Sequence, residues 1–334
     1  MKKVRWGIVG AARINEKLIP AICQSEFAEL IAIGSRRPEA AIECVTKYAK
    51  SFKEKINCFN DLNSIINSDS IDAIYIPLSN EEHTKIALEA IKNKKHVLIE
   101  KPMAIKAKEV ETLIHTAKIN RIKIMEGFMY AFHPQFDKIQ SIINSGIIGD
   151  INYGHSMFSF PIQPARFYRI NRDIKHGGGA LWDIGPYAIH TIRQCFKNKP
   201  IRVYAQSKIN EHGADISTTG MIDFGDNKRA TFDISFECTR RSEFELFGAN
   251  GRLKCPTVWQ SDSAPAKIIY TTEKSGPKEE VVPTANHFNL EIKHFNEVIL
   301  KDLNPKLSGD DAIWNCKTLE AIQESIYSKE WVLI

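Results

Sequence analysis

The chain has 334 residues, of which 43% are hydrophobic and 25% are charged, and its formal net charge is +5. This composition is that of a folded globular protein and excludes a disordered or collagen-like chain, while the length predicts two domains. The charge is spread along the chain, so basic runs such as residues 92–95 predict solvated surface rather than a nucleic-acid-binding patch, and no run reaches the ~18 apolar residues that cross a membrane.

The first predicted element is a short apolar strand over residues 4–9, which runs into a turn of small residues. A strand, a tight turn and a helix N-terminus together hold a pyrophosphate on free backbone N–H groups. The glycine fingerprint of this arrangement is degenerate, with Gly10 at its first position, Ala12 at its second and Asn15 at its third. Ala12 adds only one methyl group, so the turn still predicts dinucleotide binding. The helical pattern that follows consists of Ile14, Leu18, Ile19 and Ile22.

The second predicted strand, residues 29–34, leads into Ser35, Arg36 and Arg37. An acidic residue at this strand end binds the adenosine ribose 2′-hydroxyl of NAD, whereas arginine accommodates the 2′-phosphate of NADP. None of the three residues is acidic, so the sequence favours NADP over NAD. The alternative is a solvated basic turn.

Two further apolar strands are predicted over residues 71–77 and 97–99, with a helix between them. The second ends in Glu100, Lys101 and Pro102, and repeated strand–helix units over the first ~120 residues predict a right-handed parallel sheet. Ligands bind at the C-terminal ends of such strands. A lysine there can be desolvated and act as a proton donor or an orienting cation, or the charged pair can be a surface salt bridge.

A second candidate site follows three consecutive glycines at residues 177–179, which permit close backbone approach to a ligand or to the other domain. A helix is predicted from Ala180 to His190, with Pro186 in its first turn or at a kink. Asp183 and Tyr187 are then four residues apart on one face. A carboxylate and a phenol can grip a polyol and move a proton, or they can form a hydrogen bond that only fixes a domain interface.

After residue 150 the pattern changes to alternating segments at residues 201–205, 220–224 and 230–236, which predict antiparallel strands. Residues 243–253 predict two strands around an Asn-Gly turn, and residues 289–301 and 311–328 predict helices. The second domain is therefore expected to be α+β, with a large and mostly antiparallel open sheet.

Several single residues have a structural interpretation. His133, which precedes a proline, is predicted to be structural rather than catalytic, and the alternation of Phe128, Tyr130 and Phe132 indicates a strand with one face near the site. The seven cysteines are scattered without a CxxC pair, which favours reduced thiols in a cytoplasmic protein. Neither the cysteines nor the ten histidines show metal-ligand spacing, so no metal is expected.

Three motifs in order resemble those of the glucose-fructose oxidoreductase/inositol dehydrogenase (Gfo/Idh/MocA) family: Glu100-Lys101-Pro102 and residues 126–135 and 177–187. The resemblance implies a Rossmann NAD(P)-binding domain over residues 1–123. It implies a substrate-binding and oligomerisation α+β domain over residues 124–334, with a C-terminal helix that packs back on the first domain. A homodimer or homotetramer is implied as well.

The resemblance also assigns residues. The catalytic group is Lys101, Asp183 and Tyr187, and tyrosine in place of the common histidine resembles the branch of aldose and dihydrodiol dehydrogenases and nucleotide-sugar 3-ketoreductases. An arginine of the loop that contains Arg166, Arg169 and Arg172 is expected to reach the substrate, although the spacing does not identify it. The predicted cofactor contacts are Gly10, Ala12, Arg13, Ile14, Ser35, Arg36, Arg37, Leu78, Asn80, His83, Glu100 and Lys101. The predicted substrate contacts are Lys101, Tyr130, Arg166, Arg169, Asp183 and Tyr187.

The predicted function is an NAD(P)-dependent oxidoreductase that transfers a hydride between nicotinamide, preferably NADP, and a carbonyl or carbinol carbon of a sugar or nucleotide sugar. Either Tyr187 or Lys101 donates the proton, with Asp183 orienting the sugar. The alternatives are a dehydrogenase of non-sugar trans-diols and a non-catalytic regulator that senses the dinucleotide. Such a regulator would be expected to lose the lysine or the Asp–Tyr pair, and this chain keeps all three residues.

Overall fold

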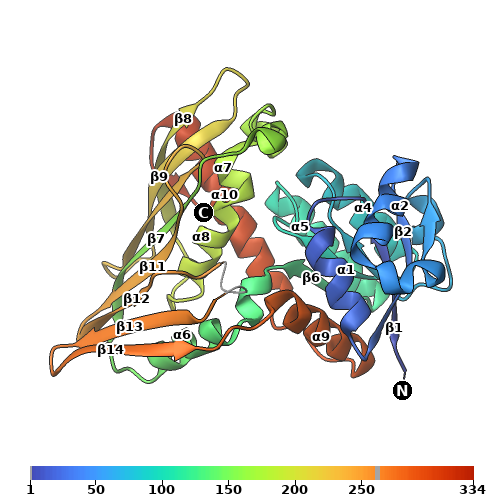
Figure 1. Cartoon of the computed structure of the whole chain (residues 1–334). Helices are drawn as coiled ribbons and strands as arrows, with labels where there is room; N and C mark the ends of the chain where they lie inside the picture. Colours follow the sequence, from blue (N-terminus) through green and yellow to red (C-terminus); the bar gives the residue numbers. More distant parts are fainter. Residues whose placement is uncertain (1, 260–263) are drawn as a thin grey trace. The chain divides into compact units, whose positions relative to one another are not determined.

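The computed structural model describes residues 2–259 and 264–334, which form two compact units (Figure 1). The first unit comprises Met1–Met129 and His287–Ile313, and the second comprises Tyr130–Asn286 and Trp314–Ile334. The first unit therefore extends past the expected boundary at residue 123, because the strand Ile124–Gly127 pairs within its sheet. It also takes in a helix from the C-terminal part of the chain.

The first unit is built on a six-stranded sheet in the order β3-β2-β1-β4-β5-β6, and every pair in it is parallel. This is the Rossmann strand order, in which dinucleotides bind where the order reverses, between β1 and β4. The predicted parallel sheet is confirmed. Its strands are β1 (Val4–Val9), β2 (Ala28–Gly34), β3 (Asn57–Phe59), β4 (Ala73–Ile76), β5 (His96–Glu100) and β6 (Ile124–Gly127).

Helices connect these strands and bury their apolar faces on the sheet (Figure 1). One of them comes from far along the chain: α9 packs on α1 and β1, where the buried Trp6 indole donates a hydrogen bond to Asn296 Oδ1 at 2.9 Å. The helices of this unit are α1 (Asn15–Gln24), α2 (Pro38–Tyr48), α3 (Asn63–Ile66), α4 (Asn80–Lys92), α5 (Ala107–Asn120) and α9 (His287–Leu300), with a 3₁₀ helix at Lys50–Lys55.

The second unit contains a nine-stranded sheet in the order β14-β13-β12-β11-β7-β10-β9-β8-β15. Its pairs are antiparallel except for β7 with β10, so the expected large and mostly antiparallel sheet is confirmed. The predicted hairpin closes through Ala249 and Asn250, with Gly251 as the first residue of β12. The strands are β7 (Ile151–Ser159), β8 (Arg202–Ile209), β9 (Asp215–Asp223), β10 (Arg229–Ser235), β11 (Arg241–Gly248), β12 (Gly251–Cys255), β13 (Ala266–Thr272), β14 (Ser275–Val282) and β15 (Val332–Leu333).

Helices α7, α8 and α10 lie along one face of this sheet, and α6 packs on β13 (Figure 1). Along β11 the side chains alternate between buried and half-buried, as expected when one face of a sheet is covered. None of the helices within the described residues is long and apolar enough to span a membrane. The helices are α6 (Pro134–Asn144), α7 (Gly179–Asp183), α8 (Gly185–Arg193) and α10 (Gly309–Ser328), with 3₁₀ helices at Met129–Phe132, Pro164–Arg169 and Ile174–His176.

The segment around Tyr130 differs from the prediction. Met129–Phe132 is a 3₁₀ helix rather than a strand. The aromatic alternation does not reflect a strand, because Ala131 between Tyr130 and Phe132 is as buried as the two aromatic residues. His133 follows as the N-cap of α6, where its Nδ1 accepts the Gln135 N–H at 3.1 Å, which confirms the structural role.

Candidate active site

The turn after β1 is built to receive an anion. Gly10 has φ +127°, a conformation that L side chains rarely adopt, and a Cβ there would lie 2.7 Å from Leu78 Cδ2. Residues 11–14 are partly or fully exposed, and no acceptor among the described residues is recorded for the N–H groups of Ala12, Arg13 and Ile14. These groups precede the ten-residue helix α1, so the turn presents donors and a helix dipole to a phosphate.

Asn15 explains how the degenerate fingerprint keeps its shape. It is completely buried, and its Nδ2 donates to the Gly10 carbonyl oxygen at 2.9 Å. A glycine at this position would allow close packing of helix and strand but could not make this bond. Asn15 therefore ties the start of α1 to the turn by a hydrogen bond.

The basic turn after β2 lies against the phosphate turn. The Ser35 Oγ accepts the Arg37 N–H at 3.1 Å, and the Arg37 Nη2 donates to the Ala11 carbonyl oxygen at 3.4 Å. The side chain of Arg37 therefore contacts the backbone of the turn after β1.

Arg36 has an intramolecular partner. Its Nη1 lies 2.7 Å from Glu82 Oε1 on α4, and 64% of its side chain is exposed. Burial alone would raise the pKa of Glu82, but the Arg36 guanidinium and the Ser79 hydroxyl hold it below its ordinary value. Glu82 therefore competes as an anion with any phosphate that Arg36 would bind.

Two buried side chains hold the backbone that follows Lys101. Lys101 is partly exposed between the buried residues 97–99 and 102–104. The His83 Nδ1 lies 2.8 Å from the Pro102 carbonyl oxygen, and the Glu126 Oε1 accepts the Met103 N–H at 2.7 Å. The lysine therefore stands on a segment fixed from α4 and from β6.

His83 does not itself line the cofactor site. It is fully buried, and its Nε2 lies 3.1 Å from the Leu78 carbonyl oxygen, so the ring bridges the loops after β4 and β5. Burial lowers the pKa of His83 to about 4, although both carbonyl contacts favour the protonated ring. We expected His83 to contact the cofactor directly. Because its ring is fully buried, it instead positions the two loops that it joins.

The buried imidazole predicts a pH dependence of stability. The unfolded ring binds a proton near pH 6.5 and the folded ring only near pH 4, so the contribution is complete above pH 6.5 and lost as the pH falls towards 4. We expect His83→Gln to remove roughly 3 kcal/mol of the acid-induced loss in unfolding free energy. Urea unfolding at pH 7, 5.5 and 4 measures this loss, with the exposed His115→Gln as control. An unchanged loss in His83→Gln would refute the buried neutral ring.

The carboxylate that precedes Lys101 has its own buried surroundings. The Tyr75 hydroxyl donates to Glu100 Oε1 at 2.5 Å. Burial raises the pKa of Glu291 on α9 well above its ordinary value, and the charge of Glu100 raises it further. Sequence reasoning missed Glu291, since nothing near it in the sequence links α9 to the end of β5.

Asp183 and Tyr187 are the partly exposed residues of a buried segment. All the other residues from 181 to 192 are buried, so these two side chains share the accessible side. The segment predicted as one helix is two, because α7 ends at Asp183 and α8 begins at Gly185, and of the two positions foreseen for Pro186 the structure has the one in a first turn. Pro186 lies in the first turn of α8, where it has no N–H to donate to the Trp182 carbonyl oxygen, and Ile184 between the two helices has φ −109° and ψ −21°.

The glycine triplet serves packing within the second unit. A Cβ on Gly178 would lie 1.9 Å from the Arg172 carbonyl oxygen, and one on Gly179 would lie 1.9 Å from Asp215 Oδ1. Gly177 and Gly179 also have positive φ, at 77° and 87°. The close approach foreseen for a ligand or the other domain is therefore made to these two groups.

Tyr130 lies behind Tyr187. It is 1% exposed, and its hydroxyl lies 2.5 Å from His190 Nδ1 and 2.8 Å from Thr191 Oγ1. Its ring centroid is 6.1 Å from that of Tyr187. Burial leaves no surface for the substrate contact expected of Tyr130, which instead supports the segment that carries Tyr187.

The structure distinguishes between the loop arginines. Arg169 forms an ion pair with Asp183, whose side chain is 11% exposed. Arg166 places its guanidinium carbon 5.5 Å from the centroid of the Phe160 ring. Of the three arginines, Arg169 is therefore the one with a described ion pair to Asp183.

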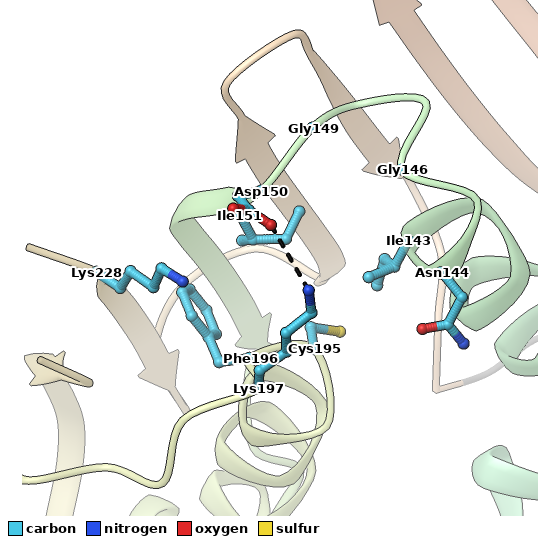
Figure 2. A pocket seen from close by; sticks show the side chains of 10 residues that line it. All are labelled: Ile143, Asn144, Gly146, Gly149, Asp150, Ile151, Cys195, Phe196, Lys197 and Lys228. Carbon is cyan, nitrogen blue, oxygen red and sulfur yellow. Dashed lines mark ion pairs between the residues drawn. The ribbon is translucent and has the colours of Figure 1, made fainter. Parts of the chain in front are cut away.

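The second unit also contains a hollow of about 410 Å³ that none of these residues lines (Figure 2). In it the Lys197 ammonium lies 3.6 Å from Asp150 Oδ1. Burial raises the pKa of the Cys195 thiol well above its ordinary value, so the hollow offers no reactive thiolate. Its lining residues are Ile143, Asn144, Gly146, Gly149, Asp150, Ile151, Cys195, Phe196, Lys197 and Lys228.

Two family models match the chain. Residues 4–128 match the family model described as "Oxidoreductase family, NAD-binding Rossmann fold", and residues 136–254 match the GFO/IDH/MocA C-terminal domain. An uncharacterised oxidoreductase of Rhizobium meliloti is 30% identical over 99% of each chain. An NADP⁺-dependent D-xylose 1-dehydrogenase of Haloferax volcanii is 28% identical over 96% of each chain.

Among solved structures, the fold is similar to that of a 3-ketoreductase from Actinomadura kijaniata, crystallised with NADP and TDP-benzene. The TM-score is 0.89 at 23% identity, and the match covers 97% of this chain and 98% of the other. The two family models together match more than half of the chain, and the first of them is described as a Rossmann fold, in agreement with the strand order of the first unit. The chain therefore belongs to the Gfo/Idh/MocA family of oxidoreductases.

Proposed function

We propose that this oxidoreductase uses NADP to transfer a hydride to or from a carbon of a sugar or nucleotide sugar. The observation that carries the proposal is the signature segment in which Asp183 and Tyr187 alone remain accessible between residues 181 and 192. A carboxylate and a phenol suit a polyhydroxylated substrate, because both bind hydroxyl groups and the phenol can exchange a proton. The xylose dehydrogenase and the 3-ketoreductase among the relatives support the same substrate class.

The cofactor preference rests on the two turns of the first unit. The phosphate turn leaves N–H groups available, and Arg37 lies over Ala11 with no acidic residue at the end of β2. The residues proposed to hold the dinucleotide are those predicted from the sequence, except that His83 acts through the loops it joins. Glu100 and Asn80, at the ends of β5 and β4, stay in the proposed set.

NADP, when bound, supplies or accepts hydride at C4 of its nicotinamide. The proton that accompanies the hydride is assigned to Lys101 and Tyr187, which we propose act as one unit. In the reducing direction, one of them protonates the developing alkoxide while Asp183 orients the sugar hydroxyls. General acid–base help of this kind contributes ~10²–10⁴-fold to a rate. Arg169, which forms an ion pair with Asp183 in this structure, orients that carboxylate.

A substrate panel tests the proposal. Free aldoses, keto-nucleotide-sugars and aromatic trans-diols are each assayed with NADP(H) and NAD(H) by absorbance at 340 nm. We expect turnover with a sugar or nucleotide sugar, and a higher kcat/KM with NADP(H) than with NAD(H). Turnover of diols alone would replace the substrate class, and dinucleotide binding without turnover on any substrate would favour a sensing role.

We further propose a homodimer or homotetramer assembled through the sheet face that carries no helix in Figure 1. Polar ladders cover this face: the Tyr153 hydroxyl lies 2.5 Å from Thr231 Oγ1, and the Lys254 ammonium lies 3.0 Å from Glu245 Oε1. A flat, half-exposed sheet face of this kind is suited to pairing with a second copy. We also propose a cytoplasmic location, since all seven cysteines are free thiols.

A further inference from the structure

Asp215, the first residue of β9, is a buried carboxylate that the catalytic assignment does not use. It is 0% exposed, and it lies 34 residues after Leu181, so no local sequence pattern connects it with the signature segment. Its Oδ2 accepts the Leu181 N–H at 2.8 Å and the Thr218 hydroxyl at 2.7 Å. Its Oδ1 lies against Gly179, where a Cβ would come within 1.9 Å.

These contacts place the carboxylate at the N-terminal turn of α7. Leu181 is the third residue of that helix, and its N–H is one of those that a helix start leaves without a partner. The residue that precedes the helix, Gly178, has no side chain to cap it. Asp215 therefore performs from another strand the task that an N-cap side chain performs locally.

The same helix is held from a second direction. The Trp182 indole donates to Gln323 Oε1 on α10 at 2.8 Å. Only Trp182 lies between Leu181, whose amide Asp215 binds, and Asp183, whose side chain pairs with Arg169. A rotation of the first turn of α7 would move Asp183, and with it the start of α8 that carries Tyr187.

We propose that Asp215 is a positioning residue for the substrate site: its carboxylate fixes the first turn of α7 and thereby orients Asp183 and Tyr187. This inference rests on the proposed function of those two residues. Two neighbours hold the carboxylate in this place: the Thr218 hydroxyl orients it, and Gly179, which lacks a Cβ, leaves room for it. Such buried, fully enclosed carboxylates cost free energy to ionise and are retained where they fix a geometry.

The ionisation of Asp215 gives the proposal a specific readout. Burial raises the pKa of Asp215 to about 6, against the lowering effect of its hydrogen bonds from Thr218 and Leu181. Tyr327 on α10 is an ionisable neighbour of Asp215. Burial raises the pKa of its phenol, and the charges of Asp173 and Asp215 raise it further. The Lys175 ammonium lies 5.0 Å from the centroid of the Tyr327 ring. The activity of the wild type should therefore have an acidic limb near pH 6 that depends on Asp215.

The experiment compares Asp215→Asn and Asp215→Ala with Asp223→Asn, which removes a carboxylate from the other end of the same strand, where it pairs with Arg202. We expect Asp215→Asn, which is neutral at every pH, to lose the acidic limb and to have at pH 7.5 the lower kcat/KM that the wild type has below pH 6, because a neutral amide oxygen accepts the Leu181 N–H less strongly than a carboxylate does. Asp215→Ala should raise the KM for the sugar at least tenfold and leave the dissociation constant for NADP unchanged. The control variant should match the wild type in all three measurements.

Hydrogen exchange at the Leu181 amide separates this inference from the function on which it rests. The amide should lose protection in Asp215→Ala and keep it in Asp223→Asn, whatever the substrate proves to be. If no sugar is turned over by the wild type, loss of protection still supports the positioning role while the proposed function fails. If Asp215→Ala does not fold, Asp215→Asn alone decides. An acidic limb retained in Asp215→Asn, or a wild-type KM and protected amide in a folded Asp215→Ala, overturns the inference.

Discussion

Lys101→Met and Tyr187→Phe are each expected to lower turnover by ~10²–10⁴-fold while the affinity for NADP changes little. The reason is that, in the proposed mechanism, each substitution removes a proton-transferring group and leaves unchanged the two turns proposed to bind the dinucleotide. Lys101 also stays on a segment whose backbone is held independently by His83 and Glu126, so its loss should not move the loop. Steady-state kinetics together with fluorescence titration of NADP separate the two effects.

The double variant tests whether Lys101 and Tyr187 transfer the proton together or as two separate groups. The effects of substituting groups that act together are strongly non-additive. Lys101→Met combined with Tyr187→Phe should therefore be scarcely slower than the slower of the two single variants. Two substitutions serve as controls. Lys106→Met changes an exposed lysine of the first structural unit, and Tyr204→Phe changes a half-buried tyrosine on β8. If Tyr187→Phe keeps near wild-type turnover, Lys101 is the donor and the tyrosine only positions the substrate. If Lys101→Met also stays active, the catalytic assignment is wrong.

Arg36→Ala combined with Arg37→Ala is expected to raise the KM for NADP strongly and to leave the KM for NAD nearly unchanged. A hydrogen bond to a charged group contributes about 1.5–3 kcal/mol, so the loss of even one contact to the 2′-phosphate corresponds to about ten- to hundredfold. Both guanidinium groups lie on the turn after β2, and Arg37 reaches the phosphate turn at Ala11.

A substitution of Glu82 tests the same site, with the KM for NADP expected to fall instead of rise. Its carboxylate holds Arg36 at 2.7 Å, so Glu82→Gln should release this arginine and lower the KM for NADP. Arg13→Ala, in the turn after β1, should instead raise the KM for both NADP and NAD. Equal losses for NADP and NAD in the double arginine variant, or a wild-type preference for NAD, would contradict the assignment of the basic turn.

The parallel strands and their functional ends could be predicted because buried strands are continuous apolar runs and ligand-binding residues follow them directly. Lys101 after β5 and the basic turn after β2 were found in this way. The break between α7 and α8 was less certain from the sequence, because a proline can either start a helix or kink it. In the folded chain Pro186 lies in the first turn of a new helix.

The residues that sequence reasoning missed act through contacts between distant segments. Asp215 binds the Leu181 amide, Glu126 binds the Met103 amide, and Glu291 on α9 interacts with Glu100. Each partner belongs to a different element, so no local period or spacing connects it with the site. His83 was recognised as a site residue, but its role changed because burial, unlike residue type, is set by the packing of the whole unit.

Hydride transfer itself is the most direct test of the central claim. The wild-type enzyme is incubated with NADPH deuterated at C4 on each face in turn and with the keto-sugar that the substrate panel identifies, and the product is analysed by mass spectrometry and NMR. We predict that one deuterium from one face appears on the carbinol carbon of the sugar, and that Lys101→Met slows its appearance by at least a hundredfold. A sugar product without deuterium from either face, or unchanged transfer in Lys101→Met, would contradict the account.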